Sequence, residues 1–260
     1  MKTYLDKNVY EAALERIAYC FQEFDNVLVS FSGGKDSVAL TIGLARLRQY
    51  LGFPFEVVAV TLDPQFGGKP VDYSALEALF RRYDVPYEVR RTLIGPIVFD
   101  YRNEKNPCSL CAKMRRGALH AAAEELDCNK VALGHHLDDA IETFYMNLWR
   151  EGRIGCFSPV TELSDRGLIL IRPLLLATEQ EVRCAVKEEG FPIIKSRCPA
   201  DGVTTREDTK NFVRERCRTD RAFRQKTLHA LQESGIDGWR PLHPARTSKK
   251  EDTAHADARI

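Results

Sequence analysis

A six-residue segment near the start of the chain has the composition of a phosphate-binding loop. Its residues are Ser32, Gly33, Gly34, Lys35, Asp36 and Ser37. The two glycines lack the Cβ atoms that would block a close approach of phosphate, the lysine supplies a positive charge, and the serine hydroxyls can donate hydrogen bonds. The segment is not a Walker loop, because no glycine stands at Val29 and an aspartate occupies the place of the required Ser or Thr. We therefore expect a phosphate site of another type; the alternative is an ordinary strand-to-helix turn that uses glycine for its geometry.

Two of the eight cysteines, Cys108 and Cys111, stand three positions apart at the predicted start of a helix. There the helix dipole lowers the pKa of a thiol, and the spacing lets both sulfur atoms reach one metal or cluster. A redox pair or half of a zinc site would use the same spacing. No second pair of this kind follows, so a single loop cysteine, Cys198, is left to complete a set of three, which suits an iron–sulfur cluster with one open iron. The cysteines that we expect not to bind metal are Cys20, Cys128, Cys156, Cys184 and Cys217.

A second group of polar residues follows a later predicted strand. The group consists of Gly134, His135, His136, Asp138 and Asp139. Ligands of parallel sheets bind outside the carboxyl ends of the strands, so these residues should face a bound nucleotide. Asp138 and Asp139 can hold Mg²⁺ on phosphates, or one of them can act as a general base; a helix cap is the alternative for one of the two. Adjacent side chains point in different directions, so we expect one histidine of the pair, His135 or His136, to contact the nucleotide and the other to be structural; His135 is the candidate ATP contact.

Arg115 and Arg116 lie about one helical turn beyond the paired cysteines. Together with Lys35 they can reach a phosphate, or stabilise the charge that develops as a phosphate leaving group departs. The alternative is a basic helix face that is only solvated. We expect these three cations to take part in catalysis.

Alternating strands and helices must position these residues. Apolar runs predict strands, and apolar residues at helical spacing predict helices. The predicted strands are 26–31, 55–62, 86–91, 130–133 and 168–171; the predicted helices are 8–24, 36–50, 72–83, 109–126, 138–149 and 178–189, with further helices within 206–233. The repeated βα units predict an α/β fold, an open parallel sheet of the Rossmann-like type with helices on both faces and a helical C-terminal extension.

The composition limits the class of protein but does not by itself indicate a function. The chain has 260 residues, 44% of them hydrophobic, which is enough for one large globular domain. Its formal net charge is +1, so any nucleic-acid surface must be a local patch. No apolar run reaches the roughly 18 residues of a membrane helix, and the first twenty residues do not resemble a signal peptide. We expect a cytoplasmic protein that does not bind a membrane.

Three segments are expected along the chain. Residues 1–190 form the nucleotide-binding domain with the paired cysteines as an insertion, residues 191–241 carry the cysteine loop and basic helices, and residues 242–260 are a disordered tail. Cations exceed anions between Arg206 and Lys226, which makes that segment a candidate contact for nucleic-acid phosphates; an amphipathic helix pair without this role is the alternative.

The string SGGKDS at 32–37 resembles the signature of the PP-loop ATP pyrophosphatases, and the resemblance implies that ATP is cleaved between its α and β phosphates. After it come CSLCAKMRRGAL, LGHHLDD, IRPLL, and FPII followed by a cysteine. This ordered set, spread over about Tyr19 to Gly202, closely resembles the tRNA 2-thiocytidine synthetases. In that family ATP activates a cytidine of the tRNA anticodon loop, and sulfur replaces its 2-keto oxygen.

The resemblance also implies cofactors, partners and site residues. ATP, Mg²⁺ and a 4Fe-4S cluster are the implied cofactors; tRNA and a sulfur donor, either a cysteine desulfurase or sulfide, are the implied partners, and a homodimer is a candidate assembly. The cluster ligands map onto Cys108, Cys111 and Cys198, although the family usually has a second CxxC after FPII and this chain has one cysteine, shifted by one residue. Arg172 in IRPLL and the strand end at 61–63 are implied ATP contacts; the strand-end residues are Thr61, Leu62 and Asp63.

The leading hypothesis is a tRNA-thiolating enzyme that adenylates the base carbonyl oxygen and then exchanges AMP for sulfur. A PP-loop thiouridine synthetase would act on another base with the same parts. A lysidine-type ligase would keep the adenylation but use an amine, for which no cluster is needed. The non-enzymatic alternative is an ATP-binding redox sensor whose cysteines report oxidation.

Overall fold

The computed structural model describes residues 20–48, 54–68, 71–102, 107–200 and 205–240. The strands are β1 (Asn26–Ser30), β2 (Glu56–Asp63), β3 (Tyr87–Arg91), β4 (Lys130–Ala132), β5 (Val160–Leu163) and β6 (Leu168–Ile171). The α-helices are α2 (Lys35–Leu47), α3 (Ser74–Arg82), α4 (Pro107–Glu125), α5 (Leu137–Arg150), α6 (Glu179–Glu188), α7 (Thr205–Thr219) and α8 (Phe223–Ser234). Short helical turns are η2 (Phe66–Gly68), the π-type η3 (Pro96–Tyr101), η4 (Ser164–Arg166) and η5 (Ile236–Gly238).

The described strands form one sheet in the order β3-β2-β1-β4-β6-β5. All neighbours are parallel except β5 and β6, which are antiparallel. The chain proceeds outward from β1 to β2 and β3, and then returns to place β4 on the other side of β1. The loops after β1 and β4 therefore diverge at a topological switch point, where sheets of this kind bind ligands.

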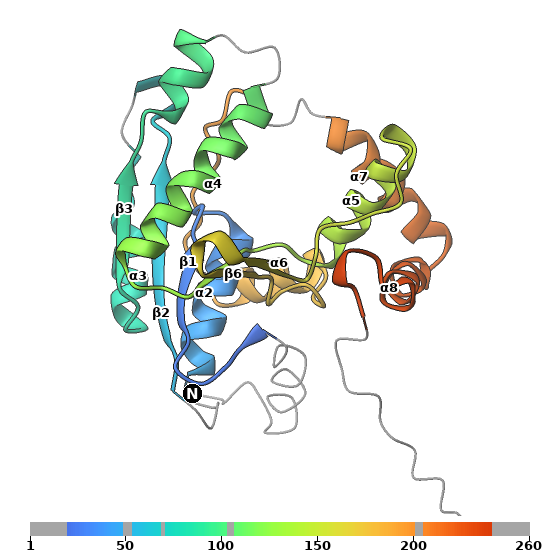
Figure 1. Ribbon diagram of the computed structural model, residues 1–260, viewed down its shortest axis with the longest axis horizontal. Coiled ribbons are helices and arrows are strands. Elements are labelled where there is room, and N and C mark those ends of the chain that lie inside the picture. The colour runs from blue at the N-terminus through green and yellow to red at the C-terminus, as the bar shows by residue number, and fades with distance from the viewer. Residues whose placement is uncertain (1–19, 49–53, 69–70, 103–106, 201–204, 241–260) are drawn as a thin grey trace, which may run out of the picture.

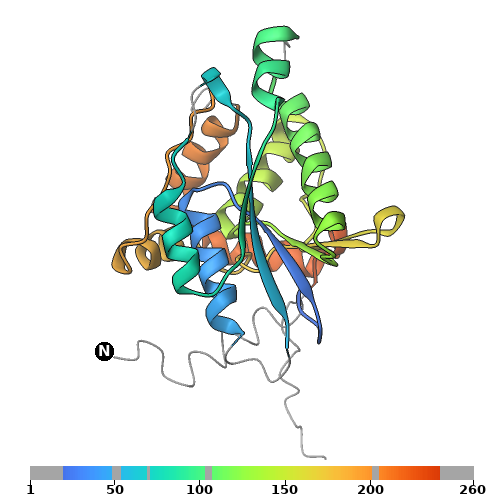
Figure 2. The same ribbon diagram turned by 90° about the vertical axis from the view of Figure 1, so that its left-hand side faces the viewer.

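Helices cover both faces of the sheet, as predicted, and β1 shows why. Val27 and Val29 point into a core shared with α2 and α3, whereas Leu28 points into a second core with α4. Because successive side chains of a strand face opposite sides, a wholly apolar strand is the pattern expected for a sheet buried on both faces. Figure 2 shows α2 and α3, in blue and teal, on one side of the central strands and α4, in green, on the other.

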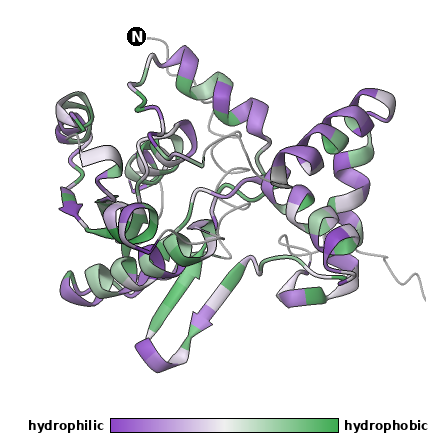
Figure 3. Cartoon of the chain, turned by 90° about the horizontal axis from the view of Figure 1, so that it is seen from above, coloured by the Kyte–Doolittle hydropathy of each residue, from purple (hydrophilic) through white to green (hydrophobic). Residues whose placement is uncertain are grey.

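The C-terminal helices α7 and α8 pack against α5 and form a separate apolar core with it. Val213 of α7 and Leu228 of α8 are buried there with Ile141 of α5. The ring of Tyr145 on α5 stacks on Phe223 with 5.4 Å between ring centroids. Figure 1 shows these three helices grouped at the opposite side of the molecule from β3, and Figure 3 shows hydrophilic residues alternating with hydrophobic ones along the helices.

Two local predictions differ from the structure. The segment 160–163, for which no strand was predicted, is strand β5, which pairs along β6 from Val160 with Ile171 to Leu163 with Leu168. The predicted helix 8–24 is wrong at its end, because residues 21–24 are not helical and Phe24 has a φ of 63°. The rest of that helix, through residue 19, and the predicted tail 242–260 lie outside the described residues.

Candidate active site at the carboxyl edge of the sheet

The predicted phosphate loop links β1 to α2, and hydrogen bonds between its serine hydroxyl groups and its backbone fix its shape. Ser37 Oγ donates to the carbonyl of Gly34 at 2.9 Å, and the Ser32 backbone N–H donates to Ser37 Oγ at 3.2 Å. Gly33 has a φ of 81°, a left-handed conformation that favours glycine, and a Cβ at this position would lie 3.0 Å from Ile194 Cβ. The Ile194 N–H donates to the Gly33 carbonyl at 2.8 Å. The segment before Cys198 therefore fixes the back of the loop, while the N-terminus of α2 remains available for an anion.

The lysine of this loop is held between two carboxylates. Lys35 Nζ lies 2.8 Å from Asp36 Oδ1 and 3.3 Å from Glu179 Oε1, at the start of α6. Glu179 Oε1 also lies 3.6 Å from Lys210 Nζ on α7 and 2.9 Å from Arg183 Nη2. Burial acts to raise the pKa of Glu179, but the charges of Lys210 and Lys35, with hydrogen bonds from Lys35 and Arg183, lower it to about 2. Glu179 is thus an anion at neutral pH that links the phosphate loop to α7.

The loop after β4 approaches the phosphate loop closely. A Cβ on Gly134 would lie 3.4 Å from the backbone carbon of Asp36 and from Ser37 N, so glycine permits the two loops to touch. His136 caps α5: its Nδ1 accepts from Asp139 N–H at 3.3 Å, and Asp139 Oδ2 accepts from His136 N–H at 2.9 Å. His136 Nε2 lies 3.7 Å from Asp36 Oδ1. The structure therefore brings Asp36, Gly134, His136 and Asp139 together.

Asp138 is buried and bridges three elements. Its Oδ2 accepts from the Glu179 backbone N–H at 2.7 Å, and its Oδ1 accepts from Arg224 Nε at 2.6 Å. Only 3% of Asp138 is exposed. Both carboxylate oxygens therefore accept hydrogen bonds, one from the start of α6 and one from α8, and Asp138 holds these two helices against α5.

The end of β2 places its predicted ATP contacts at the same edge. Thr61, Leu62 and Asp63 are buried, and the Thr61 hydroxyl lies 2.9 Å from the Tyr87 hydroxyl. Asp63 Oδ1 accepts from the Gln65 N–H at 2.9 Å and so shapes the turn that follows the strand.

Arg172 and His135 both lie against the ring of Phe157, near the end of β6. The Arg172 guanidinium lies 5.0 Å from the centroid of the Phe157 ring, and the His135 ring stacks on Phe157 at 4.9 Å. Arg172 is buried and donates to the carbonyl of Ser158 and to the Thr161 hydroxyl. These contacts hold Arg172 against β5 and the segment before it.

The three cysteines that we interpreted as cluster ligands lie in one neighbourhood. Cys108 is exposed, Cys111 is buried and Cys198 is partly buried. Burial raises the pKa of the Cys111 thiol, Arg115 acts to lower it, and the Cys198 and Cys108 thiols act to raise it further, so the sulfur atoms are close enough to interact electrostatically. In the described part of the chain no three His, Cys, Asp or Glu side chains are arranged to hold a single metal ion. A 4Fe-4S cluster differs, because each thiolate binds its own iron; three thiols are the donor set that such a cluster uses, and their assignment as its ligands stays a prediction.

Arg115 and Arg116 point toward different surroundings. Arg115 acts on the Cys111 thiol and on the hydroxyl of Tyr73. Arg116 acts on His120, whose pKa is lowered by burial and then by Arg166 and Arg116. Of the two arginines, Arg115 therefore acts on a cysteine thiol, and Arg116 acts on His120 of the same helix.

Sequence reasoning missed Glu179 and Tyr73. Glu179 is one of several acidic residues on α6, and its selection by Lys35 and Lys210 depends on packing between α2, α6 and α7. One signal was present: the Thr178–Glu181 capping box fixes where α6 begins and therefore where Glu179 stands. Tyr73 precedes α3 and carried no motif.

Comparisons with known proteins agree with this arrangement. The model of the PP-loop domain family matches residues 5–218. The tRNA-cytidine(32) 2-sulfurtransferase of Syntrophotalea carbinolica is 35% identical over 91% of this chain and 90% of its own length. The protein of the same name from Alkalilimnicola ehrlichii is 38% identical over 75% of this chain and 62% of its own length. Among solved structures, the U34-tRNA thiolase NcsA from Methanococcus maripaludis with its 4Fe-4S cluster has a TM-score of 0.72 at 21% identity, covering 86% of this chain and 76% of that one, and shares the fold.

Proposed function

Because the chain belongs to the PP-loop domain family, we propose that it is an ATP-dependent tRNA sulfurtransferase that converts cytidine 32 of tRNA to 2-thiocytidine. The observation that supports the proposal is a phosphate loop in the same chain as three cysteines, of which Cys108 and Cys198 both act on the pKa of the Cys111 thiol. A lysidine-type ligase needs only the loop, and a redox sensor needs only the cysteines. The relatives from Syntrophotalea and Alkalilimnicola are named for this same reaction.

ATP binds with its phosphates at the N-terminus of α2, where the loop N–H groups and Lys35 face the charge. The adenine lies at the end of β2, against the backbone of Thr61, Leu62 and Asp63. Asp139 is the better candidate than Asp138 for Mg²⁺, because both oxygens of Asp138 are engaged with Glu179 and Arg224. Asp36 lies next to the same histidine as Asp139, but both of its oxygens accept from Lys35 Nζ, at 2.8 and 3.0 Å.

The reaction balances in two steps. The O2 atom of cytosine attacks the α-phosphate and pyrophosphate leaves, with Lys35 and Arg115 as the cations that oppose the charge of the leaving group. A sulfide sulfur then attacks C2, and AMP departs with the former O2 atom. Cys108, Cys111 and Cys198 would hold the 4Fe-4S cluster, which supplies an open iron at which sulfur can be bound.

The partners are part of the proposal. The tRNA contacts α7 and α8, and Arg214, Arg216 and Arg218 of α7 contribute to a local excess of cations. Sulfur comes from a cysteine desulfurase or from free sulfide in the cytoplasm, and a homodimer is the candidate assembly. No helix in the described residues is long and apolar enough to cross a membrane.

The test is an anaerobic assay with purified tRNA, ATP and sulfide. We expect 2-thiocytidine at position 32, detected by mass spectrometry of digested tRNA, together with equal amounts of AMP and pyrophosphate. Cys198→Ala should lose the iron and the product, while Cys184→Ala, an exposed cysteine on α6, should keep both. An iron-free protein that forms AMP and pyrophosphate with tRNA and an amine would instead indicate a ligase.

A further inference from the structure

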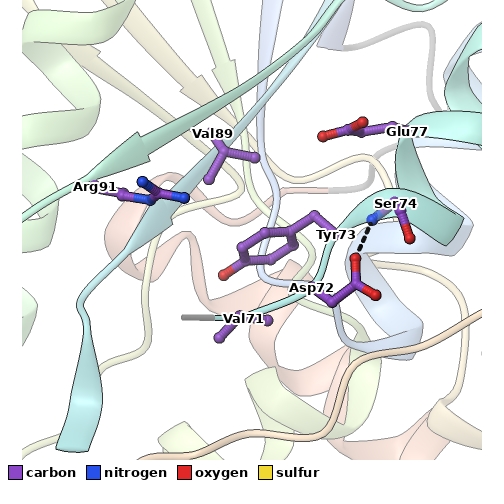
Figure 4. Close-up of a pocket in the computed structure, with 7 residues that line it drawn as sticks. All are labelled: Val71, Asp72, Tyr73, Ser74, Glu77, Val89 and Arg91. Atoms are coloured by element: carbon purple, nitrogen blue, oxygen red, sulfur yellow. Dashed lines mark hydrogen bonds between the residues drawn. The ribbon is translucent and has the colours of Figure 1, made fainter. Parts of the chain in front are cut away.

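A cavity of about 450 Å³ lies between α3 and the edge strand β3, and the described reaction has no role for it. Its lining includes the aromatic ring of Tyr73, the carboxylate of Glu77, the guanidinium of Arg91 and the apolar side chain of Val89. Figure 4 shows the Tyr73 ring with Arg91 on one side and Glu77 on the other. Asp72 also lines the cavity, but its Oδ1 is occupied: it accepts a hydrogen bond of 2.9 Å from the N–H of Ser74, the first residue of α3. The volume is in the range of sites that bind small organic groups.

This cavity lies at the carboxyl edge of the sheet, beside the residues proposed for ATP and sulfur. In the parallel pairing of β2 with β3, Arg91 stands next to Asp63 and Val89 next to Thr61. The Tyr73 pKa is raised by burial and by Asp63, and lowered by Arg197 and Arg115, so its hydroxyl senses all three charges. Arg197 adjoins Cys198, and Arg115 lies one turn beyond Cys111. The cavity therefore adjoins both halves of the proposed reaction centre.

We propose that this cavity receives the cytosine of the substrate tRNA, with Tyr73 stacking on the base and with Glu77 and Arg91 reading its Watson–Crick edge. The proposal rests on the proposed function, and it names the residues that select the base. Cytosine presents an amino donor at N4 and an acceptor at N3, which match a carboxylate and a guanidinium. Uracil presents an acceptor at O4 and a donor at N3. Its O4 would therefore meet the carboxylate, which can only accept, and its N3–H would meet the guanidinium, which can only donate. The O2 atom takes no part in this pairing and is left for activation.

A base held in this way must leave its stack in the RNA. Enzymes that modify a base extrude it into a pocket, and single-stranded loops, such as the anticodon loop, offer bases that stack readily on aromatic side chains. Adenine also presents an amino donor beside a ring acceptor, so the adenine of ATP is the competing occupant. The proposed ATP contacts at the end of β2 favour cytosine, because they already place the adenine on the β2 backbone.

The experiment uses the cluster-loaded enzyme with a non-hydrolysable ATP analogue and two anticodon stem-loop RNAs, identical except for C or U at position 32. Fluorescence anisotropy gives the dissociation constant of each RNA. The wild type should prefer the C32 RNA by about 5- to 150-fold, the ratio expected for a good pair of hydrogen bonds to one base. Glu77→Gln should reduce this preference toward one, because the amide can donate or accept. Tyr73→Ala should weaken both RNAs by at least about fivefold through lost stacking, and Tyr73→Phe should not.

Glu188→Gln is the matched control, because it removes an exposed carboxylate on α6, away from the cavity. A Glu77→Gln enzyme that thiolates C32 RNA and keeps the full C-over-U preference overturns the cavity assignment and leaves the proposed function intact. Weaker binding of the ATP analogue by Glu77→Gln, with the base preference unchanged, also overturns it and assigns the cavity to adenine. A wild-type enzyme that thiolates neither RNA overturns the proposed function itself.

Discussion

Burial distinguishes the thiols of Cys128 and Cys156 from the exposed thiols of Cys108 and Cys184. Burial raises the pKa of Cys128 to about 11 and, as the largest effect, that of Cys156 to about 12, so both remain protonated thiols at neutral pH. Cys108 and Cys184 are exposed. Since the thiolate is the nucleophile and the iron ligand, the first two are poor ligands and poor targets for alkylation.

Alkylation with iodoacetamide at pH 7.5 should therefore distinguish these thiols in the folded protein. In the cluster-free protein we expect modification of Cys108 and Cys184 and protection of Cys128 and Cys156, as measured by peptide mass spectrometry. In the cluster-loaded protein Cys108 should become protected while Cys184 still reacts, which provides an internal control. Equal reactivity of Cys108 with and without bound iron would contradict its assignment as a ligand.

Residue types could be predicted at this scale, but their partners could not. The sequence identified both Asp138 and Asp139 without separating them. The structure separates them by geometry: Asp139 pairs with His136, three positions away, whereas Asp138 binds Arg224, 86 positions away. The first contact follows from local helix capping, and the second depends on how α8 packs.

At the scale of elements, helices and strands with strong apolar patterns were predicted close to their observed bounds. The exceptions have few or mixed local signals. Strand β5 has four residues and exists because it pairs with β6 across the turn at Gly167, whose φ is 62°. The π-type turn η3, before the paired cysteines, has no periodicity that distinguishes it from an ordinary helix. Apolar patterns report burial, whereas edge pairing and helix subtype depend on the neighbouring segments.

The turn between β1 and α2 provides a paired test, because its two glycines have different tasks. Gly33→Ala should lower the free energy of unfolding by about 1–3 kcal/mol, the usual cost of a left-handed conformation for a residue with a side chain. Its Cβ would also lie 3.0 Å from Ile194 Cβ. Gly34 has a φ of −78° and only Ser32 Oγ, at 3.5 Å, within contact of an added Cβ. Gly34→Ala should therefore unfold in urea like the wild type.

The same pair separates stability from ATP binding. Gly34→Ala should weaken ATP binding by placing a methyl group where the phosphates approach the N-terminus of α2, and isothermal titration calorimetry measures this. Loss of stability in Gly34→Ala equal to that in Gly33→Ala would show that the strain argument is wrong. Unchanged ATP affinity in Gly34→Ala would show that the phosphates do not lie at this turn.

At the scale of the whole molecule, ionic contacts join the sheet domain to the C-terminal helices. Asp138 on α5 binds Arg224 on α8, and Glu179 on α6 lies between Lys35 on α2 and Lys210 on α7. The sequence predicted a basic extension but not where it would dock, because these contacts join residues that are far apart in the chain. This packing links α7, the proposed tRNA contact, to the phosphate loop, because Glu179 pairs with both Lys210 of α7 and Lys35 of the loop.

Glu179→Gln should expose this link through the pH dependence of stability. The pKa of Glu179 is about 2 in the folded chain, below the ordinary 4.5, so its ionised form stabilises the fold. That contribution is complete above about pH 5 and is lost as the pH falls from 4.5 toward 2. Urea unfolding should therefore show Glu179→Gln less stable than the wild type at pH 7, with a gap that closes on acidification. Glu188→Gln, exposed on the same helix, should show no such gap; a Glu179→Gln gap that stays constant from pH 7 to pH 3 would mean that the carboxylate charge does not hold α2 and α7 together.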